Sequence, residues 1–355
     1  LVFGLSFIIS SSFYCILLIY MPLNFVIKDF FEVFKPLIYG FIFISGMLIS
    51  EYLDEEKIIN YILASVVFLV VFSSLVFFPQ TYPFLDLYKG RTSDAAYNFH
   101  FFRFSGSLGY PGGFGYWLVL GIQVTMLAYY KSMLSSKKFM LLYGLGLLGL
   151  VFSGARGAVI IFVLSSLLFF LSTPTKRKTF FFSILFILLL ISFLAFLFSG
   201  QSDIQAIAHF QKLLENAGGG TFGHRASELE RLFEALSDGR LLGAGPNNYF
   251  IKSTYGPVES AYYFYGYKFG LVGLLAYGFL IYTFLVMGVK LFFYRFTLNL
   301  PFIVSCWALL NLVVAGVSNS ITEEYKSFYM FFLLSGIVYK QYIDKFEPQF
   351  NKKKH

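Results

Sequence analysis

Long apolar runs separated by short polar segments recur from one end of the chain to the other. A helix that crosses a lipid bilayer needs about 20 mostly apolar residues, because an unpaired backbone amide is not tolerated in hydrocarbon. Runs of this kind cover residues 1–27, 36–50, 58–78, 114–130, 139–153, 157–172, 179–199, 268–288, 300–318 and 328–340. The pattern therefore predicts an all-α, polytopic membrane helical bundle of about ten transmembrane helices.

Positive charges between the runs indicate which way the bundle faces, because short cytoplasmic loops carry an excess of lysine and arginine. Basic residues gather in the loops 131–138, 173–178 and 289–299 and in the tail from residue 340 onward. Counting the runs in order puts all these segments on one side, which is predicted to be cytoplasmic together with both termini. The acidic segment 54–56 lies on the same side and is expected to be a solvated turn.

The two longest segments between runs, 79–113 and 200–267, then lie on the outer side. We predict one membrane domain over residues 1–355, with 200–267 as a long, partly helical extracytoplasmic loop within it.

Two helices are expected in this loop, at residues 203–215 and 225–237. The apolar positions of the second helix share one face and are Leu229, Leu232, Phe233 and Leu236. A face of this kind so near a bilayer is expected to rest on the membrane surface or on the bundle. Gly243, Gly245 and Pro246 predict a tight turn after it.

Composition excludes a soluble fold and several kinds of chemistry. Hydrophobic residues make up 57% of the chain and charged residues only 13%, whereas soluble domains carry about 25% charged residues. The net charge of +8 is explained by the cytoplasmic lysine and arginine excess, so no nucleic-acid partner is expected. No phosphate-binding loop, dinucleotide fingerprint or nucleophile elbow is present. His209 and His224 lack companions at metal-ligand spacing, and no metal or cofactor is predicted.

Arginine at the edge of a membrane bundle is costly and therefore needs a partner or a function. Arg156 lies within the small-residue segment 153–158, between two apolar runs with almost no loop. Its neighbours leave the guanidinium room to face a cavity; the alternatives are a snorkelling side chain or a pair with Glu323. Arg103 precedes a glycine-rich outer segment that either offers backbone amides to an anion or simply turns the chain.

Further candidates come from the outer loop and its end. Arg225 and Arg231 lie on the second loop helix, where each is either a solvated surface charge or one of several planar cations suited to phosphate. Glu259 is a candidate general base or arginine partner, with a helix N-terminal carboxylate as the alternative. Tyr262 and Tyr263 either stack on sugar rings or belong to the interfacial aromatic belt.

From about residue 100 to about residue 340, the chain resembles the superfamily of O-antigen ligases and Wzy-type O-antigen or capsule polymerases. The similar segments are Arg103-x-x-Gly106 with Pro111, the Ser-Gly-Ala-Arg-Gly-Ala segment 153–158, the loop segment 224–250, and 259–273 with its Gly-x-x-Gly helix start. Tyr110 and Gly112 replace the asparagines that flank this proline in the family. Glu259-Ser260 stands where the ligases are expected to carry His-Asn, so the resemblance favours a polymerase.

The resemblance implies a GT-C-like glycosyltransferase that joins undecaprenyl-diphosphate-linked oligosaccharides on the outer face of the bacterial cytoplasmic membrane. In this reading Arg103, Arg156 and a loop arginine bind the diphosphate, and Glu259 activates the acceptor hydroxyl. Expected partners are the lipid-linked donor and acceptor, the bilayer and a chain-length regulator protein.

Three alternatives stay open on the sequence. A ligase would transfer finished glycan from the same donor to another acceptor. A transporter or flippase would carry charged or broken helices near the bilayer midplane, whereas here the charges stand almost wholly at the ends of the runs. A non-enzymatic scaffold for glycan assembly is the third.

Overall fold

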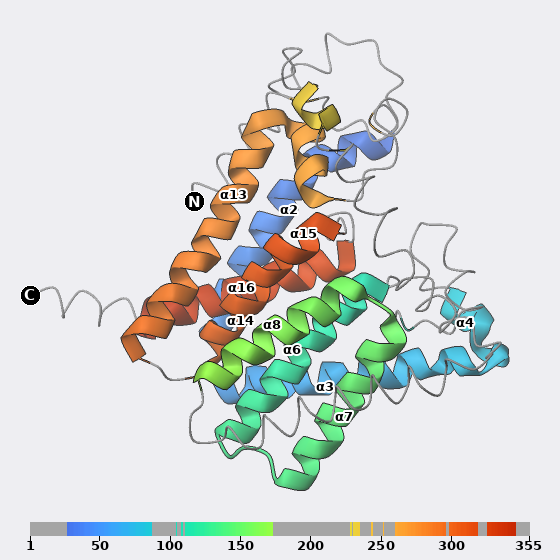
Figure 1. Cartoon of the computed structure of the whole chain (residues 1–355), viewed down its shortest axis with the longest axis vertical. Helices are drawn as coiled ribbons and strands as arrows, with labels where there is room; N and C mark the ends of the chain where they lie inside the picture. The colour runs from blue at the N-terminus through green and yellow to red at the C-terminus, as the bar shows by residue number, and fades with distance from the viewer. Residues whose placement is uncertain are drawn as a thin grey trace, which may run out of the picture. The chain divides into compact units, whose positions relative to one another are not determined.

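The computed structural model describes residues 27–86, 104, 108, 111–172, 228, 230–234, 243, 251, 260–295, 298–318 and 325–345 (Figure 1). This part of the chain is helical with short turns and contains no strand, which confirms the predicted all-α class there. Every predicted run except 1–27 and 179–199 coincides with a described helix; those two lie, apart from Ile27, outside the described residues.

Three helices of the described part are long and apolar enough to cross a membrane, namely Glu55–Phe77, Ser136–Ser153 and Ala261–Phe293. Shorter apolar helices cover Leu37–Ser50, Gly157–Phe169 and Leu300–Ala315. Their length and composition indicate a membrane protein.

The chain divides into two compact units. One contains residues 1–52, 218–289 and 312–355, and the other contains residues 53–217 and 290–311. We call the first the outer-loop unit, after the predicted loop 200–267, of which it contains the greater part, and the second the α6 unit.

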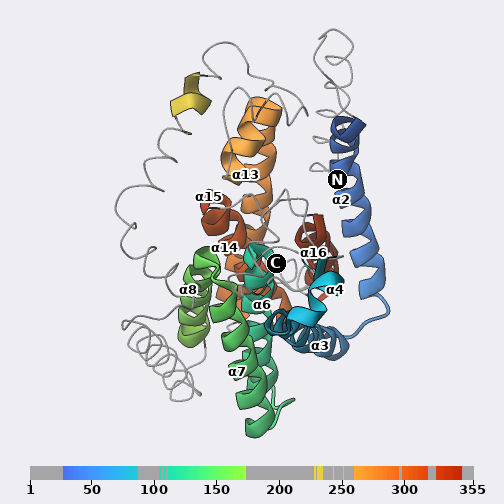
Figure 2. The same cartoon turned by 90° about the vertical axis from the view of Figure 1, so that its right-hand side faces the viewer.

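The α6 unit is built around one central helix. Its helices are α3 (Glu55–Ser74), α6 (Pro111–Tyr130), α7 (Ser136–Ser153), α8 (Arg156–Ser172) and α14 (Leu300–Leu310). Short helices η1 (Leu75–Phe77), η2 (Pro79–Thr81) and α4 (Tyr82–Asp86) follow α3. Helices α3, α7, α8 and α14 all contact α6 (Figure 2). Residues 112–128 of α6 are buried without exception.

Glycines allow these helices to approach α6 closely. A Cβ at Gly121 of α6 would collide with the side chain of Val66, and one at Gly146 of α7 would lie 2.7 Å from Cγ1 of Ile122. Inside a bilayer there is no hydrophobic drive between helices, so association depends on such close packing of small residues.

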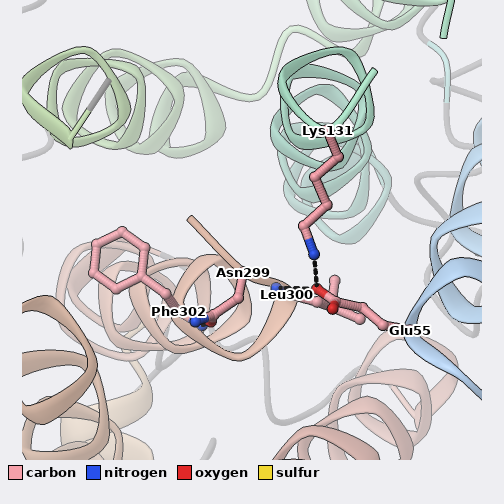
Figure 3. A network of polar contacts seen from close by, with 5 residues as sticks. All are labelled: Glu55, Lys131, Asn299, Leu300 and Phe302. Carbon is pink, nitrogen blue, oxygen red and sulfur yellow. Dashed lines mark hydrogen bonds and ion pairs between the residues drawn. The ribbon is translucent and has the colours of Figure 1, made fainter. Parts of the chain in front are cut away.

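A polar network joins three helix ends of the α6 unit (Figure 3). Glu55, at the start of α3, accepts a hydrogen bond from the backbone N–H of Leu300 at 2.8 Å and pairs with Lys131 at 2.7 Å. Asn299 caps α14 by accepting from the N–H of Phe302 at 2.9 Å. The expected solvated turn at 54–56 is therefore wrong for Glu55, because its carboxylate satisfies a helix N-terminal amide.

Replacement of Glu55 by alanine should lower the free energy of unfolding by about 2 kcal/mol, the usual value of a hydrogen bond to a charged group. Both tryptophans, Trp117 and Trp307, lie in the same unit with ring centroids 6.0 Å apart, so tryptophan fluorescence during thermal unfolding reports the change. The neighbouring Glu56 is exposed, and Glu56→Ala is the matched control. Equal melting temperatures for the two variants would contradict the role of Glu55.

The outer-loop unit contains α2 (Ile27–Ser50), most of α13 (Ala261–Arg295), α15 (Gly316–Ser318) and α16 (Tyr325–Lys345). Helices α2 and α16 lie side by side and run in the same direction. At one end Tyr39 stacks on Phe332 with centroids 5.1 Å apart, and at the other Lys340 pairs with Glu51 at 3.5 Å.

Helix α13 is kinked at Gly270, where φ is 60° and ψ is −147°. This conformation strongly favours glycine. Two helical stretches of α13 meet at this kink. The second carries the run predicted at 268–288 and begins at the expected Gly-x-x-Gly helix start, whereas the first, which begins at Ala261, was not predicted. Hydropathy located the apolar core of the helix but missed its first turns, which are rich in tyrosine.

Candidate functional site

The segment that carries Arg156 is a tight turn between α7 and α8. Gly154 ends α7 in the left-handed conformation, with φ 59°, and Arg156 is the first residue of α8. The hydroxyl of Ser153 accepts a hydrogen bond from the N–H of Ala155 at 3.2 Å. The packing of this turn fixes the backbone from which the Arg156 side chain extends.

Helix α6 closes over this turn through Gly115. A Cβ at Gly115 would lie 2.9 Å from Cβ of Ala155, 2.9 Å from Cβ of Ala158 and 3.1 Å from Oγ of Ser153. The small residues on either side of Arg156 thus serve contact between helices. A rigid backbone at this point suits a side chain that has to be preorganised.

The residue after Arg103 lies beside the same turn. The N–H of Phe104 donates to the carbonyl oxygen of Phe152 at 3.0 Å, and the two rings stack with centroids 5.0 Å apart. Phe104 is buried and also contacts Phe114 edge to face at 6.3 Å. The backbone of Phe104, the residue after Arg103, is therefore in direct contact with Phe152. Phe152 lies at the end of α7, four residues before Arg156.

In the outer-loop unit, helical residues 228 and 230–234, here called the segment 228–234, pack on α13. Leu232 is buried against Gly266, where a Cβ would lie 2.7 Å from Cδ1 of Leu232. The predicted loop helix is confirmed where it is described. Of its predicted apolar face, Leu232 rests on the bundle, whereas Phe233 is 63% exposed.

The glycine turn of the loop seats on the kink of α13. Gly243 has φ 80°, and a Cβ there would lie 2.5 Å from the backbone nitrogen of Gly270 and 2.7 Å from the carbonyl oxygen of Lys268. Two segments that stand apart in the sequence, Gly243-x-Gly245 and Gly270-x-x-Gly273, are thus in backbone contact at Gly243 and Gly270.

Hydroxyl groups bind the backbone where α14 gives way to a π-helical stretch, Asn311–Ala315. Ser260 donates to the carbonyl oxygen of Gly316 at 2.9 Å, and Tyr277 donates to that of Leu312 at 2.9 Å. The hydroxyl of Tyr262 lies 3.2 Å from the carbonyl oxygen of Leu312. π-helical turns interrupt the regular pattern of helical hydrogen bonds and are frequent at functional sites. Inside a membrane, the backbone carbonyls that such a turn leaves unpaired need other hydrogen-bond donors.

Three of the predicted site residues are described with their side chains, and all three lie in the outer-loop unit. Arg103, Arg225 and Glu259 lie outside the described residues, and Arg156 is placed by its backbone only. Arg231, Tyr262 and Tyr263 are all partly buried in the outer-loop unit, and Tyr263 packs against the cluster of Leu232, Ile251 and Tyr267. Among the residues that the structure describes, no group of three His, Cys, Asp or Glu side chains could hold a metal ion.

Sequence reasoning missed several polar residues of this region. Ser260 is completely buried, and Lys268 is 1% exposed with Nζ 4.4 Å from the ring centroid of Phe264. Glu228 is also 1% exposed. The available signal for Lys268 was a lysine between the aromatic segment 262–267 and the apolar run that follows, because a charge within a membrane span is rare.

Residues 141–278 match the family model Wzy_C, which is described as O-Antigen ligase. The match confirms, for this segment, the predicted resemblance to the superfamily of O-antigen ligases and Wzy-type polymerases. It spans the α7–α8 turn, the outer loop and the kink of α13, and leaves Arg103 outside. No curated protein and no solved structure matches the chain.

Proposed function

We propose that this protein is a glycosyltransferase that polymerises undecaprenyl-diphosphate-linked oligosaccharide repeat units into O-antigen or capsular polysaccharide. It works as a GT-C-like bundle of about ten transmembrane helices in the bacterial cytoplasmic membrane. Residues 200–267 form its extracytoplasmic loop, both termini are cytoplasmic, and a chain-length regulator protein is a partner.

The observation that carries this proposal is the family match over residues 141–278, which covers the arginine turn and the loop docked on α13. The choice of polymerase over ligase rests on Glu259-Ser260, which stand where the ligases are expected to carry His-Asn. A carboxylate at this position suits a base that takes a proton from a sugar hydroxyl.

The proposed reaction is a single glycosyl transfer. The acceptor hydroxyl oxygen of one lipid-linked repeat unit forms a bond to the anomeric carbon of the growing chain. The bond from that carbon to the diphosphate oxygen breaks, undecaprenyl diphosphate leaves, and the hydroxyl proton passes to Glu259. No nucleotide is consumed, because the diphosphate ester already supplies the leaving group.

Each candidate residue has one role in this scheme. Arg103 and Arg156 bind the diphosphate and stabilise its growing negative charge as it leaves; the contact of Phe104 with Phe152 supports their cooperation. The loop residues Arg225 and Arg231 add further diphosphate contacts. Tyr262 and Tyr263 stack on the glycan through their rings, since the hydroxyl of Tyr262 is engaged with backbone carbonyls.

The description of the matching family names a second candidate function, that of an O-antigen ligase. A ligase uses the same lipid-linked donor and the same diphosphate contacts but transfers finished glycan to an acceptor outside the carrier pool. The two functions therefore differ in the products that accumulate when the protein is missing.

The length distribution of the glycan in cells deleted for this gene tests the proposal. Single repeat units in the deletion strain, with long ladders restored by the wild-type gene, are the expected result for a polymerase. Long chains that remain on the lipid carrier would establish the ligase instead. An unchanged glycan profile would overturn both and favour a transporter that another protein can replace.

A further inference from the structure

The outer loop is attached to α13 by two contacts on successive residues of that helix. The hydroxyl of Tyr267 donates a hydrogen bond to the backbone carbonyl of Glu228 at 2.8 Å, and both residues are buried. One residue earlier, Gly266 leaves the space that the side chain of Leu232 fills. Together they fix the segment 228–234 both along its axis and in rotation about it.

Arg231 lies between these two attachment points on the same helical segment. Arg231 lies three residues after Glu228, whose carbonyl accepts the hydrogen bond from Tyr267, and one residue before Leu232. Arg231 is partly buried, whereas Glu230, Phe233 and Glu234 are exposed, so Arg231 stands at the edge of the docked face. Its position therefore depends on the two contacts that hold the segment on α13.

We propose that Tyr267 is a positioning residue for Arg231: its hydrogen bond to the Glu228 carbonyl holds the loop helix where Arg231 binds the diphosphate of the lipid-linked substrate. This inference rests on the proposed function, because it takes the role of Arg231 from there. Tyr267 acts through the loop helix and does not touch the substrate, since its side chain is buried in the cluster with Leu232 and Ile251.

Loss of the tyrosine hydroxyl has a defined local effect. The Glu228 carbonyl stays buried without this donor, which shifts the loop helix toward undocked positions by about tenfold. The ring remains in place and keeps its packing on Leu232. Arg231 then binds the substrate less often, so the KM for the lipid-linked repeat unit rises while kcat changes little.

A purely structural role for Tyr267 makes a different prediction. If the hydrogen bond only stabilised the fold, its loss would change KM by the same factor in the wild-type background and in the Arg231→Gln background. If it acts through Arg231, its loss has no further effect once Arg231 is gone. A double-mutant cycle separates the two possibilities.

The experiment uses the full chain in membranes, with the lipid-linked repeat unit extracted from the deletion strain as substrate. Wild type, Tyr267→Phe, Arg231→Gln and the double variant are compared at matched abundance. We expect Tyr267→Phe to raise KM by up to about tenfold and the double variant to match Arg231→Gln within about twofold. An additional rise of KM in the double variant, multiplying the two single effects, would overturn the inference.

A second variant and a control guard against a folding defect. Gly266→Ala adds only a methyl group that displaces Leu232, and alanine favours a helix more than glycine does. It should raise KM in the same way and increase hydrogen exchange of the amides of residues 230–234. Tyr282 lies on the same helix and is 58% exposed, so Tyr282→Phe should change neither.

The outcomes separate this inference from the proposed function. Wild-type kinetics for Arg231→Gln would remove Arg231 from the proposed site and the inference with it. An impaired Arg231→Gln together with unchanged KM values for Tyr267→Phe and Gly266→Ala would overturn the inference alone.

Discussion

Replacing Arg156 by alanine is expected to lower the rate of glycan polymerisation by about a hundredfold to a thousandfold, as removal of a preorganised group that stabilises developing charge does elsewhere. The fold should be kept, because the α7–α8 turn is secured by Gly154, by the Ser153 hydroxyl and by the fit of Gly115. Arg156→Lys should restore only part of the rate, since an ammonium group cannot contact a diphosphate with a planar fork.

The measurement is the rate of polymer formation in membranes that contain equal amounts of each variant. Lys138 is an exposed cation near the start of α7, at the end of that helix far from the α7–α8 turn, and Lys138→Ala should polymerise at the wild-type rate. Full activity of a well-folded Arg156→Ala protein would remove Arg156 from the diphosphate site, whatever the other arginines do.

The apolar pattern predicted where helices lie because burial in lipid leaves a direct record in composition. The runs 139–153 and 157–172 correspond to α7 and α8 within a few residues, and the small residues between them correspond to a turn without a loop. The position of Arg156 at a helix start could therefore be predicted from the sequence. Whether its side chain meets a phosphate is a question about a ligand, on which the pattern gives no information.

Contacts between distant segments were beyond sequence reasoning. Glu55 reads as one carboxylate of a solvated turn, since nothing in its neighbourhood indicates that Lys131 and Leu300 lie beside it. Likewise Ser260 and Tyr277 are ordinary residues of an aromatic run until the carbonyls of Gly316 and Leu312 are placed next to them. Polar groups inside a membrane bundle find partners through the tertiary fold, which local spacing does not encode.

Rotation of a helix about its axis was predictable only in part. Leu232 and Phe233 both belong to the apolar stripe of the loop helix. The space that Gly266 leaves on α13, however, takes only the side chain of Leu232. Leu232 fills that space and Phe233 stays exposed. The kink at Gly270 escaped prediction for a similar reason, because hydropathy reports the environment of a residue and not its backbone angles.

The contact between α2 and α16 should be the most sensitive part of the outer-loop unit to added volume. A Cβ at Gly46 would collide with the carbonyl oxygen of Leu333, and a Cβ at Gly336 would collide with that of Phe43 and lie 3.2 Å from the backbone nitrogen of Met47. Backbone atoms cannot rotate away as a flexible side chain does. Close approach of this kind is what holds two helices together in a membrane.

Alanine at both Gly46 and Gly336 should therefore lower the free energy of unfolding by about 4 kcal/mol, since overpacking costs about 1–3 kcal/mol at each position. The variant is expected to lose most of its folded population, measured as the monodisperse fraction after detergent extraction and heating.

A methyl group at Gly40 or Gly278 would have no neighbouring atom within 4 Å, so alanine at both provides the matched control. That control should be stabilised, by up to about 1 kcal/mol at each site, because alanine favours helix. Opposite signs for two pairs of the same substitution can arise only from the space around each glycine; equal effects would mean that α2 and α16 do not pack through their glycines.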